Sequence, residues 1–300
     1  MLDWLDEPTI AALIGMGSGA VLGAAARLGR FCTLGAIEDA LYGGSLTRLR
    51  MWGIAIGVAV IAAFGLMSAG LFDPMDSFYL AQGWSLPGAI LGGLVFGYGM
   101  ALAGNCGYGA LARLGGGDMR SFVIVLVMGL VAYATLSGPL SGLRVALFAP
   151  HGGPTPGIGH LIALATGLPL WACGMLVGSA ILVLSLRGGA ALGRGTLICG
   201  ASVGLAVAMG WAGTAWLFTT GFDALPVASH SFSAPLGETM LYTMTSSGAA
   251  LSFGVGSVVG VLTGALQAAS GRGISAGKLA RTRANSSVRS SARGSWAGAR

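Results

Sequence analysis

One short phrase occurs twice in the chain, Cys-x-x-Gly-Ala followed by Ile or Leu, beginning first at Cys32 and again at Cys106. In both copies the cysteine closes an apolar stretch that is rich in glycine. A thiol is a weak hydrogen-bond donor with a soft, polarizable sulfur atom, so it suits contact with a sulfur-bearing anion that must be passed on rather than trapped. The repeated phrase therefore predicts a path for a substrate that sulfur recognises.

Backbone amides beside the two cysteines could take part in the same chemistry. A short helix that begins after each cysteine would leave its first N–H groups without partners in the helix, and these groups carry partial positive charge. The amides of Thr33 to Gly35, and those of Gly107 to Gly109, could then hold an anion without any buried cation. We expect these two stretches to be the substrate-binding main chain.

Asn105 directly precedes the second cysteine, where its amide could donate to a passing anion or could simply end a helix. Its counterpart Phe31 is apolar, so the two sites are not expected to be equivalent. Cysteine also commonly packs as a small hydrophobic residue, which is the alternative for the repeated pair. That packing role is the one expected for Cys173 and Cys199, which lie in continuous apolar runs without the Gly-Ala sequel.

The composition requires a membrane. Of the 300 residues, 54% are hydrophobic and only 9% are charged, and the mean hydropathy is +0.80, so a single soluble core could not bury the apolar side chains. The 54 glycines suit transmembrane helices whose backbones approach closely. We expect an all-α polytopic membrane protein.

Apolar runs long enough to cross the hydrocarbon layer, about 20 residues each, indicate about seven transmembrane helices. They are Ile10–Ala26, Met51–Leu71, Pro87–Gly104, Phe122–Leu140, Leu161–Leu186, Leu197–Phe218 and Gly248–Ala269. Three shorter amphipathic pieces are predicted to be re-entrant half-helices: Phe31–Tyr42, Gly107–Leu114 and Leu236–Thr245. The two cysteines are 74 residues apart, and each follows a span that runs in the same direction, which indicates an internal repeat of span, Cys-Gly turn, short helix and return span.

The distribution of positive charge predicts the orientation. The connections on one side hold all the lysines and arginines except Arg144, and seven of the sixteen lie after residue 270. Because positive residues are retained in the cytoplasm, the N-terminus is expected outside and the C-terminus inside. Residues 1–270 are the expected transmembrane transport domain, and residues 271–300 a basic, disordered cytoplasmic tail that faces anionic lipid rather than nucleic acid.

Neither a cofactor nor an enzymatic site is expected. The four cysteines form no Cys-x-x-Cys pair, and His151, His160 and His230 lack a helical ligand spacing and are expected to be solvated loop residues. There is no phosphate-binding Gly-x-x-x-x-Gly-Lys motif, and no acid falls inside a predicted span, so passive or partner-driven entry is the simpler expectation.

These residues resemble the YeeE/YedE family of sulfur-transport membrane proteins. The segment from Gly97 to Leu111 is similar to the family's Gly-rich cysteine signature, and Phe31 to Ala36 is similar to its first copy. Gly210-Trp211 and the segment from Ser231 to Pro235 are similar to the family's second half, and the likeness covers roughly residues 10–270. The resemblance implies an hourglass-shaped helical bundle in the bacterial inner membrane that imports thiosulfate or a related small sulfur anion, often alongside a small TusA-like sulfur-carrier protein.

The chain departs from that family after residue 270. Full-length members usually continue into another pair of spans with a third Gly-Cys-x-x-Gly element, and a polar tail stands in that place here. We expect either a member that works with two cysteine sites and a partner chain, or a sequence truncated or frame-shifted near residue 275. Two other functions remain as alternatives: a membrane thiol enzyme that relays sulfur covalently, which needs a persulfide or two thiols that can meet, and a non-transporting scaffold whose cysteines only pack.

Overall fold

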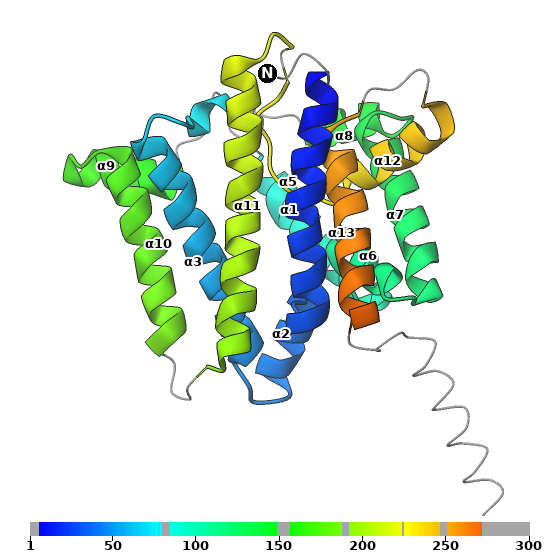
Figure 1. Ribbon diagram of the computed structural model, residues 1–300, viewed down its shortest axis with the longest axis horizontal. Coiled ribbons are helices and arrows are strands. Elements are labelled where there is room, and N and C mark those ends of the chain that lie inside the picture. The colour runs from blue at the N-terminus through cyan, green and yellow to red at the C-terminus, as the bar shows by residue number, and fades with distance from the viewer. Residues whose placement is uncertain are drawn as a thin grey trace, which may run out of the picture.

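The computed structural model describes residues 6–77, 79, 85–148, 157–187, 192–223, 225–246 and 251–271. Within these residues seven helices are long and apolar enough to cross a membrane, which confirms the expected all-α polytopic class. They are α1 (Glu7–Gly29), α3 (Thr47–Ser68), α5 (Leu86–Ala103), α7 (Met119–Leu136), α10 (Leu170–Arg187), α11 (Arg194–Thr220) and α13 (Phe253–Gly271) (Figure 1). The expected tail beyond Gly271, and His151, lie outside the described residues.

The three predicted half-helices are present. They are α2 (Thr33–Leu41), α6 (Gly107–Gly115) and α12 (Ala234–Thr245). The internal repeat is also confirmed, because α1, α2 and α3 follow one another in the same order of long, short and long helix as α5, α6 and α7. Two further short helices, α8 (Ser141–Leu147) and α9 (Ile158–Thr166), and the 3-10 turn η1 (Pro74–Asp76) were not predicted.

One predicted span is wrong in its extent. The apolar run Leu161–Leu186 was expected to form a single helix, but the chain breaks it into α9 and α10. Gly167 adopts the left-handed conformation (φ +71°) that ends α9. Pro169, which has no N–H to donate, follows two residues later, so the hydropathic run hides a break that glycine and proline impose.

Helices α1 and α13 lie side by side along most of their length and form the most closely packed helix pair (Figure 1). Gly15, Gly19 and Gly23 of α1 face the main chain of α13 at Phe253, Ser257 and Val261 in turn. Gly256, Gly260 and Gly264 of α13 face the main chain of α1 at Ala12, Met16 and Ala20. Both series ascend together, so the two helices run parallel, as a first and a seventh span must.

The bundle has two chemically different ends. At the end where α1 and α13 finish, which we call the arginine end, lie all the described arginines except Arg144 of α8. At the opposite end, the serine end, lie Glu7, Asp73, Asp76, Asp223 and Glu238. The arginines and these carboxylates thus lie at opposite ends of the bundle, as expected from their positions in alternate connections between the predicted spans.

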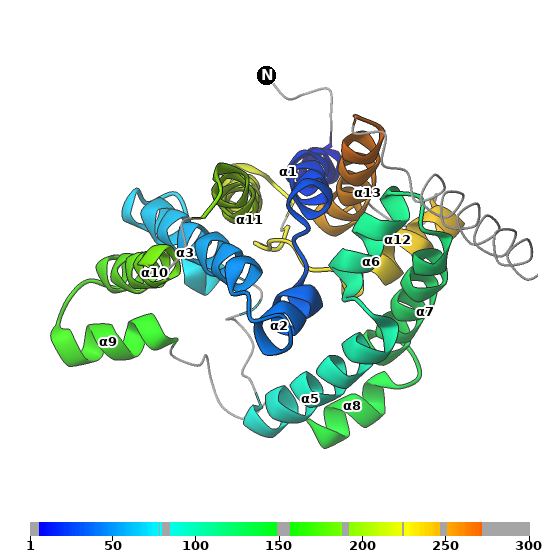
Figure 2. The same ribbon diagram turned by 90° about the horizontal axis from the view of Figure 1, so that it is seen from below.

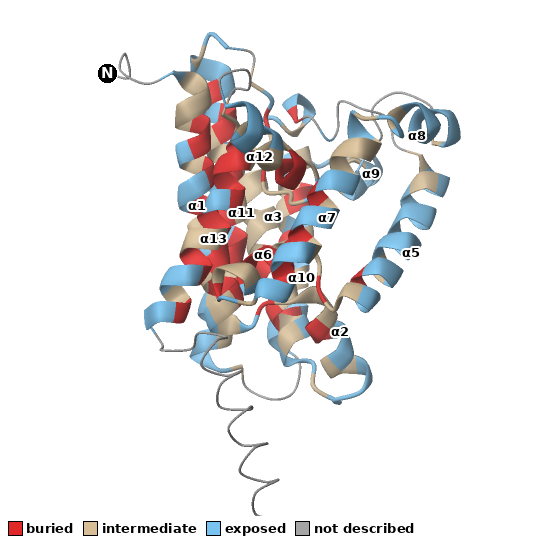
Figure 3. Cartoon of the chain, turned by 90° about the vertical axis from the view of Figure 1, so that its right-hand side faces the viewer, coloured by how far each residue is buried: buried red, intermediate tan, exposed pale blue. Residues whose placement is uncertain are grey.

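Burial is concentrated around α1, α6, α11 and α13, whereas α5, α8 and α9 lie at the periphery and are mostly exposed (Figures 2 and 3). Short helix α6 is enclosed by longer ones, and its Ala110 and Leu111 are completely buried. A nine-residue helix can therefore begin deep inside the bundle, where its polar first turn contacts protein rather than lipid.

Candidate functional site

Two cavities open at opposite ends of the central helices. The arginine pocket, of about 390 Å³, is lined by Arg27, Arg30, Arg48, Arg113, Glu38 and Cys32 together with small and apolar residues. The serine pocket, of about 370 Å³, is lined by Tyr79, Thr214, Ser229, Ser231, Glu238 and Ser252 among others. Ala11 lines the serine pocket and Ala26 the arginine pocket, so about 22 Å of α1 separates them.

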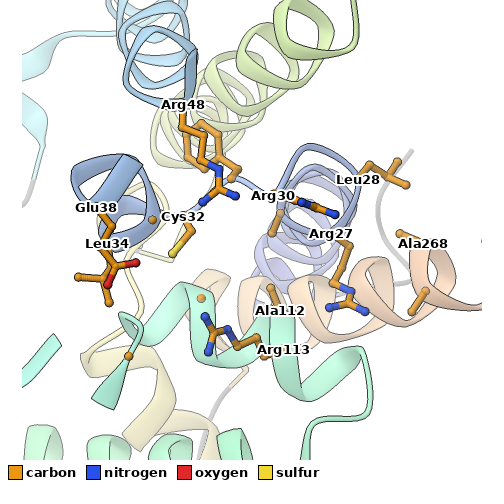
Figure 4. A pocket seen from close by; sticks show the side chains of 16 residues that line it. Arg27, Leu28, Arg30, Cys32, Leu34, Glu38, Arg48, Ala112, Arg113 and Ala268 are labelled. Carbon is orange, nitrogen blue, oxygen red and sulfur yellow. The ribbon is translucent and has the colours of Figure 1, made fainter. Parts of the chain in front are cut away.

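The arginine pocket carries excess positive charge beside a thiol. Its side chains include four arginines and one carboxylate, that of Glu38. In Figure 4 the Cys32 side chain projects toward the same space as the guanidinium groups of Arg48 and Arg113. Arg48 is held in place by an ion pair with Asp39 (Nε to Oδ2, 3.1 Å). The pocket can therefore attract a small anion to within reach of the Cys32 sulfur atom.

Glycines make room for two of these arginines. A side chain at Gly116 would overlap the Arg27 guanidinium, whose central carbon lies 2.5 Å from the position of an added Cβ. A side chain at Gly35 would similarly overlap the Arg48 guanidinium. Gly35 was predicted as a substrate-binding amide, and the structure adds that its missing side chain also admits a cation to the pocket.

Arg30 adopts an unusual backbone conformation at the end of α1. Its φ and ψ of 52° and 41° lie in the left-handed region, and it is the one non-glycine residue with positive φ among those described. This conformation costs an L-residue about 1 kcal/mol or more, and glycine would adopt it freely. An arginine here is consistent with a need for its charge in the pocket.

We therefore expect Arg30→Gly to separate stability from function. Relief of the backbone strain should raise the thermal stability of the purified protein, while loss of one pocket cation should raise the Kd for a small anion such as thiosulfate about fivefold. Thermal unfolding and titration calorimetry of the protein in detergent measure the two effects. Arg144→Gly, at an exposed position of the opposite end, is the control; an equal rise in Kd in both variants would contradict the assignment.

Both repeated cysteines occupy the residue directly before a short helix. Cys32 is the N-cap of α2 and Cys106 the N-cap of α6, and neither side chain caps its helix by a hydrogen bond. The first main-chain hydrogen bond of α2 runs from the Ala36 amide to the Cys32 carbonyl, and that of α6 runs from the Ala110 amide to the Cys106 carbonyl. The preceding amides, including those of Thr33, Gly35, Gly107 and Gly109, accordingly belong to the first turn, which lacks acceptors within its own helix.

The predicted site residues are only partly brought together. Cys32, Gly35 and Gly109 line the arginine pocket, and the Cys106 sulfur lies 3.8 Å from the position of a Gly109 Cβ, just behind that wall. Gly107 is buried beneath Met128 of α7 and the Phe232 carbonyl. Cys32 and Cys106 are both half-buried, but Cys32 lines the arginine pocket and Cys106 lies behind its wall, so the two sites are not equivalent.

An aromatic column connects the inner ends of the two cavities. Ring centroids are 4.3 Å apart for Trp52 and Phe31, 6.4 Å for Phe31 and Tyr108, 5.3 Å for Tyr108 and Phe232, and 6.3 Å for Phe232 and His230. The Tyr108 hydroxyl donates to the Leu22 carbonyl at 2.6 Å, which fixes the middle ring. These side chains from four separate segments close the space between the pockets.

Three thiols, those of Cys106, Cys199 and Cys32, lie within electrostatic range of the Tyr108 hydroxyl. Cys199 was expected to pack within a span, and in α11 it packs against Gly29 of α1 and the largest apolar cluster. Cys173 differs, because it is fully buried in α10 near the Thr166 hydroxyl and the Leu168 carbonyl. Cys173 thus fits the packing role that was predicted for it.

His230 corrects a prediction. It was expected to be a solvated loop residue, but its Nε2 atom is buried, and its Nδ1 atom lies 2.6 Å from the hydroxyl of the fully buried Ser257. Burial lowers its pKa to about 4, an effect that the nearby Ala206 main chain only partly offsets. His230 directly precedes the Ser-Phe-Ser-Ala-Pro segment. Its burial could not be predicted, because hydropathy assigns this stretch to a connection outside the membrane.

Comparison with known proteins gives consistent matches. A family model described as "Sulphur transport" matches residues 28–295. The thiosulfate transporter TsuA of Escherichia coli strain K12 is 32% identical over 135 residues, which cover 45% of this chain and 37% of that protein. The thiosulfate transporter TsuA of Spirochaeta thermophila is 29% identical over 227 residues, which cover 64% of this chain and 66% of that protein. The chain thus matches less than two thirds of the length of either relative.

Proposed function

Because this chain belongs to the sulphur transport family, we propose that it carries thiosulfate, or a closely related small sulfur anion, across the membrane between the serine pocket and the arginine pocket. The observation that carries the proposal is the pair of N-cap cysteines, each followed by first-turn amides, of which Cys32 lines the arginine pocket and Cys106 lies behind its wall. The printed names of the two curated relatives favour thiosulfate among the anions that such a site could accept.

The two parts of thiosulfate suit two parts of the site. The oxygen-bearing end takes hydrogen bonds from the first-turn amides of α2 and α6, which carry partial positive charge without a mobile cation. The terminal sulfur contacts the Cys106 and Cys32 thiols, which are weak donors and release it easily. Sulfate offers oxygen alone, so it would enter the arginine pocket but gain little at the thiols.

The charge distribution gives the proposed direction. Because positive residues are retained in the cytoplasm, the excess of arginines favours a cytoplasmic arginine end and an N-terminus outside. Thiosulfate would enter through the serine pocket, pass Cys106 and reach Cys32 in the arginine pocket. A TusA-like sulfur carrier would collect it at the arginine end, where the basic segment after Gly271 also begins.

Passage by this route leaves the cysteines chemically unchanged. The four cysteines are free thiols, and hydrogen bonding to sulfur needs neither a disulfide nor a persulfide. A reproducible persulfide, or a Cys32–Cys106 disulfide, trapped on the purified protein during turnover would instead support the sulfur-relay enzyme.

Uptake of radiolabelled thiosulfate into proteoliposomes tests the proposal. We expect uptake by the purified chain that excess unlabelled thiosulfate abolishes and that equal sulfate reduces only weakly. Empty liposomes are the control. Equal competition by sulfate would remove the thiols from substrate selection, and the absence of any uptake would overturn the transport function of this chain.

A further inference from the structure

Buried polar atoms without a hydrogen-bond partner lie at both ends of the aromatic column and in the turn before Cys106. Among the described residues, the buried side-chain nitrogen and oxygen atoms without a hydrogen-bond partner are Trp52 Nε1, His230 Nε2 and both amide atoms of Asn105. Such atoms are rare in folded proteins because burying a polar group without a partner is unfavourable. Here they belong to the two ends of the aromatic column and to the turn before Cys106, which points to a ligand that passes there.

Trp52 lies at the inner end of the arginine pocket. It follows Arg48 by four residues on α3, so the two side chains share one face of that helix. Arg48 and Phe31 both line the arginine pocket, and the Phe31 ring packs against Trp52. The indole N–H is therefore the next donor inward from the pocket arginines.

His230 occupies the corresponding place at the serine pocket. Its neighbours Ser229 and Ser231 line that pocket, as does Phe253, whose ring centroid is 5.1 Å from that of His230. We assign the Ser257 hydroxyl as the donor to Nδ1, which places the proton of the neutral imidazole on Nε2. Under this assignment the unpartnered nitrogen is a hydrogen-bond donor.

Both donors are uncharged, which matters for an anion that must leave again. A buried cation would hold thiosulfate tightly, whereas a neutral N–H replaces a water of hydration without creating a deep energy minimum. The depressed pKa of His230 keeps its ring neutral at physiological pH. Tyr108 stands between the two donors, next to the Cys106, Cys199 and Cys32 thiols.

We propose that His230 Nε2 and Trp52 Nε1 are the two neutral hydrogen-bond donors that bind the oxygen atoms of the anion immediately before and after it passes Cys106. This inference rests on the proposed transport function and adds two binding residues and a tautomer-fixing one, Ser257, to it. The donors desolvate the anion in steps, so that the thiols need only contact its sulfur.

The test compares variants that remove one N–H and keep an aromatic ring. For His230→Phe, and separately for Trp52→Phe, we expect the KM for radiolabelled thiosulfate in proteoliposomes to rise about three- to tenfold, the usual effect of losing one neutral hydrogen bond. His230→Gln, which retains an N–H donor, should recover most of the loss. Ser257→Ala should shift KM in the same direction by a smaller factor. Trp211→Phe is the matched control, because Trp211 packs against Phe72 and Tyr79 away from the column.

The outcomes distinguish this inference from the transport proposal. Normal uptake by the wild-type chain with unchanged KM in both His230→Phe and Trp52→Phe overturns the donor assignment alone. A His230→Gln variant as impaired as His230→Phe removes His230 from the assignment, and an equal effect of Trp211→Phe removes Trp52. Failure of the wild-type chain to take up thiosulfate would overturn both proposals.

Discussion

Thiosulfate uptake should fall at least about tenfold when Cys106 is replaced by serine, although the two side chains have the same shape and both can donate a hydrogen bond. The substitution removes the large, polarizable sulfur atom at the N-cap of α6. The serine hydroxyl would also cap the helix by accepting a hydrogen bond from a first-turn amide, which withdraws that amide from the anion. A serine hydroxyl is also more strongly hydrated, which raises the cost of dehydrating the turn. Cys106→Ala should be equally defective, because it removes the thiol altogether.

The matched control is Cys173→Ser, which makes the same chemical change at a fully buried thiol outside the column. We expect this variant to retain uptake if it reaches the membrane, since the Cys173 sulfur lies beside the Thr166 hydroxyl and the Leu168 carbonyl at the break between α9 and α10. Membrane abundance of each variant is measured by immunoblot beside initial uptake rates. Wild-type rates in Cys106→Ser would show that the thiol takes no part in the passage of the anion.

Alanine at Gly19 should destabilise the protein by about 2 kcal/mol or more, while alanine two residues earlier, at Gly17, should not destabilise it. A Cβ at Gly19 would lie 2.5 Å from the Ser257 carbonyl oxygen, so α1 and α13 would have to move apart. A Cβ at Gly17 meets nothing within 4 Å, and alanine is the better helix former. The same substitution therefore has opposite expected signs on two faces of one helix.

Thermal unfolding of the detergent-solubilised protein, followed by size-exclusion chromatography after heating, measures this difference. Gly17→Ala serves as the control for the general effect of a methyl group in α1. The close packing also fixes the serine hydroxyl that orients His230, so Gly19→Ala should lower uptake even at temperatures where it stays folded. Equal stability of the two variants would show that α1 and α13 do not depend on backbone contact.

The sequence alone was sufficient for the class of the protein and for its repeat. Hydrophobic runs of membrane-spanning length predicted the long helices, because an apolar segment of that size has no other stable environment. The short amphipathic pieces after Cys32 and Cys106 were predicted for the same reason, since they are too short to cross. The prediction failed where one run continued through Gly167 and Pro169, because hydropathy does not register a backbone break.

Only the tertiary structure decided which side chains share the site. More than fifty residues separate Trp52 from Tyr108, and Tyr108 from His230. No local sequence pattern shows that a histidine in a connection is buried close to the half-helix that carries Tyr108. Contact between the α11–α12 connection and α13 brings His230 to Ser257, and the repeat of long and short helices brings Cys32 and Cys106 within electrostatic range of the same tyrosine. Local composition determined that these segments would be helical and membrane-embedded; contacts between segments distant in the sequence determined which buried polar groups were left without partners among the described residues.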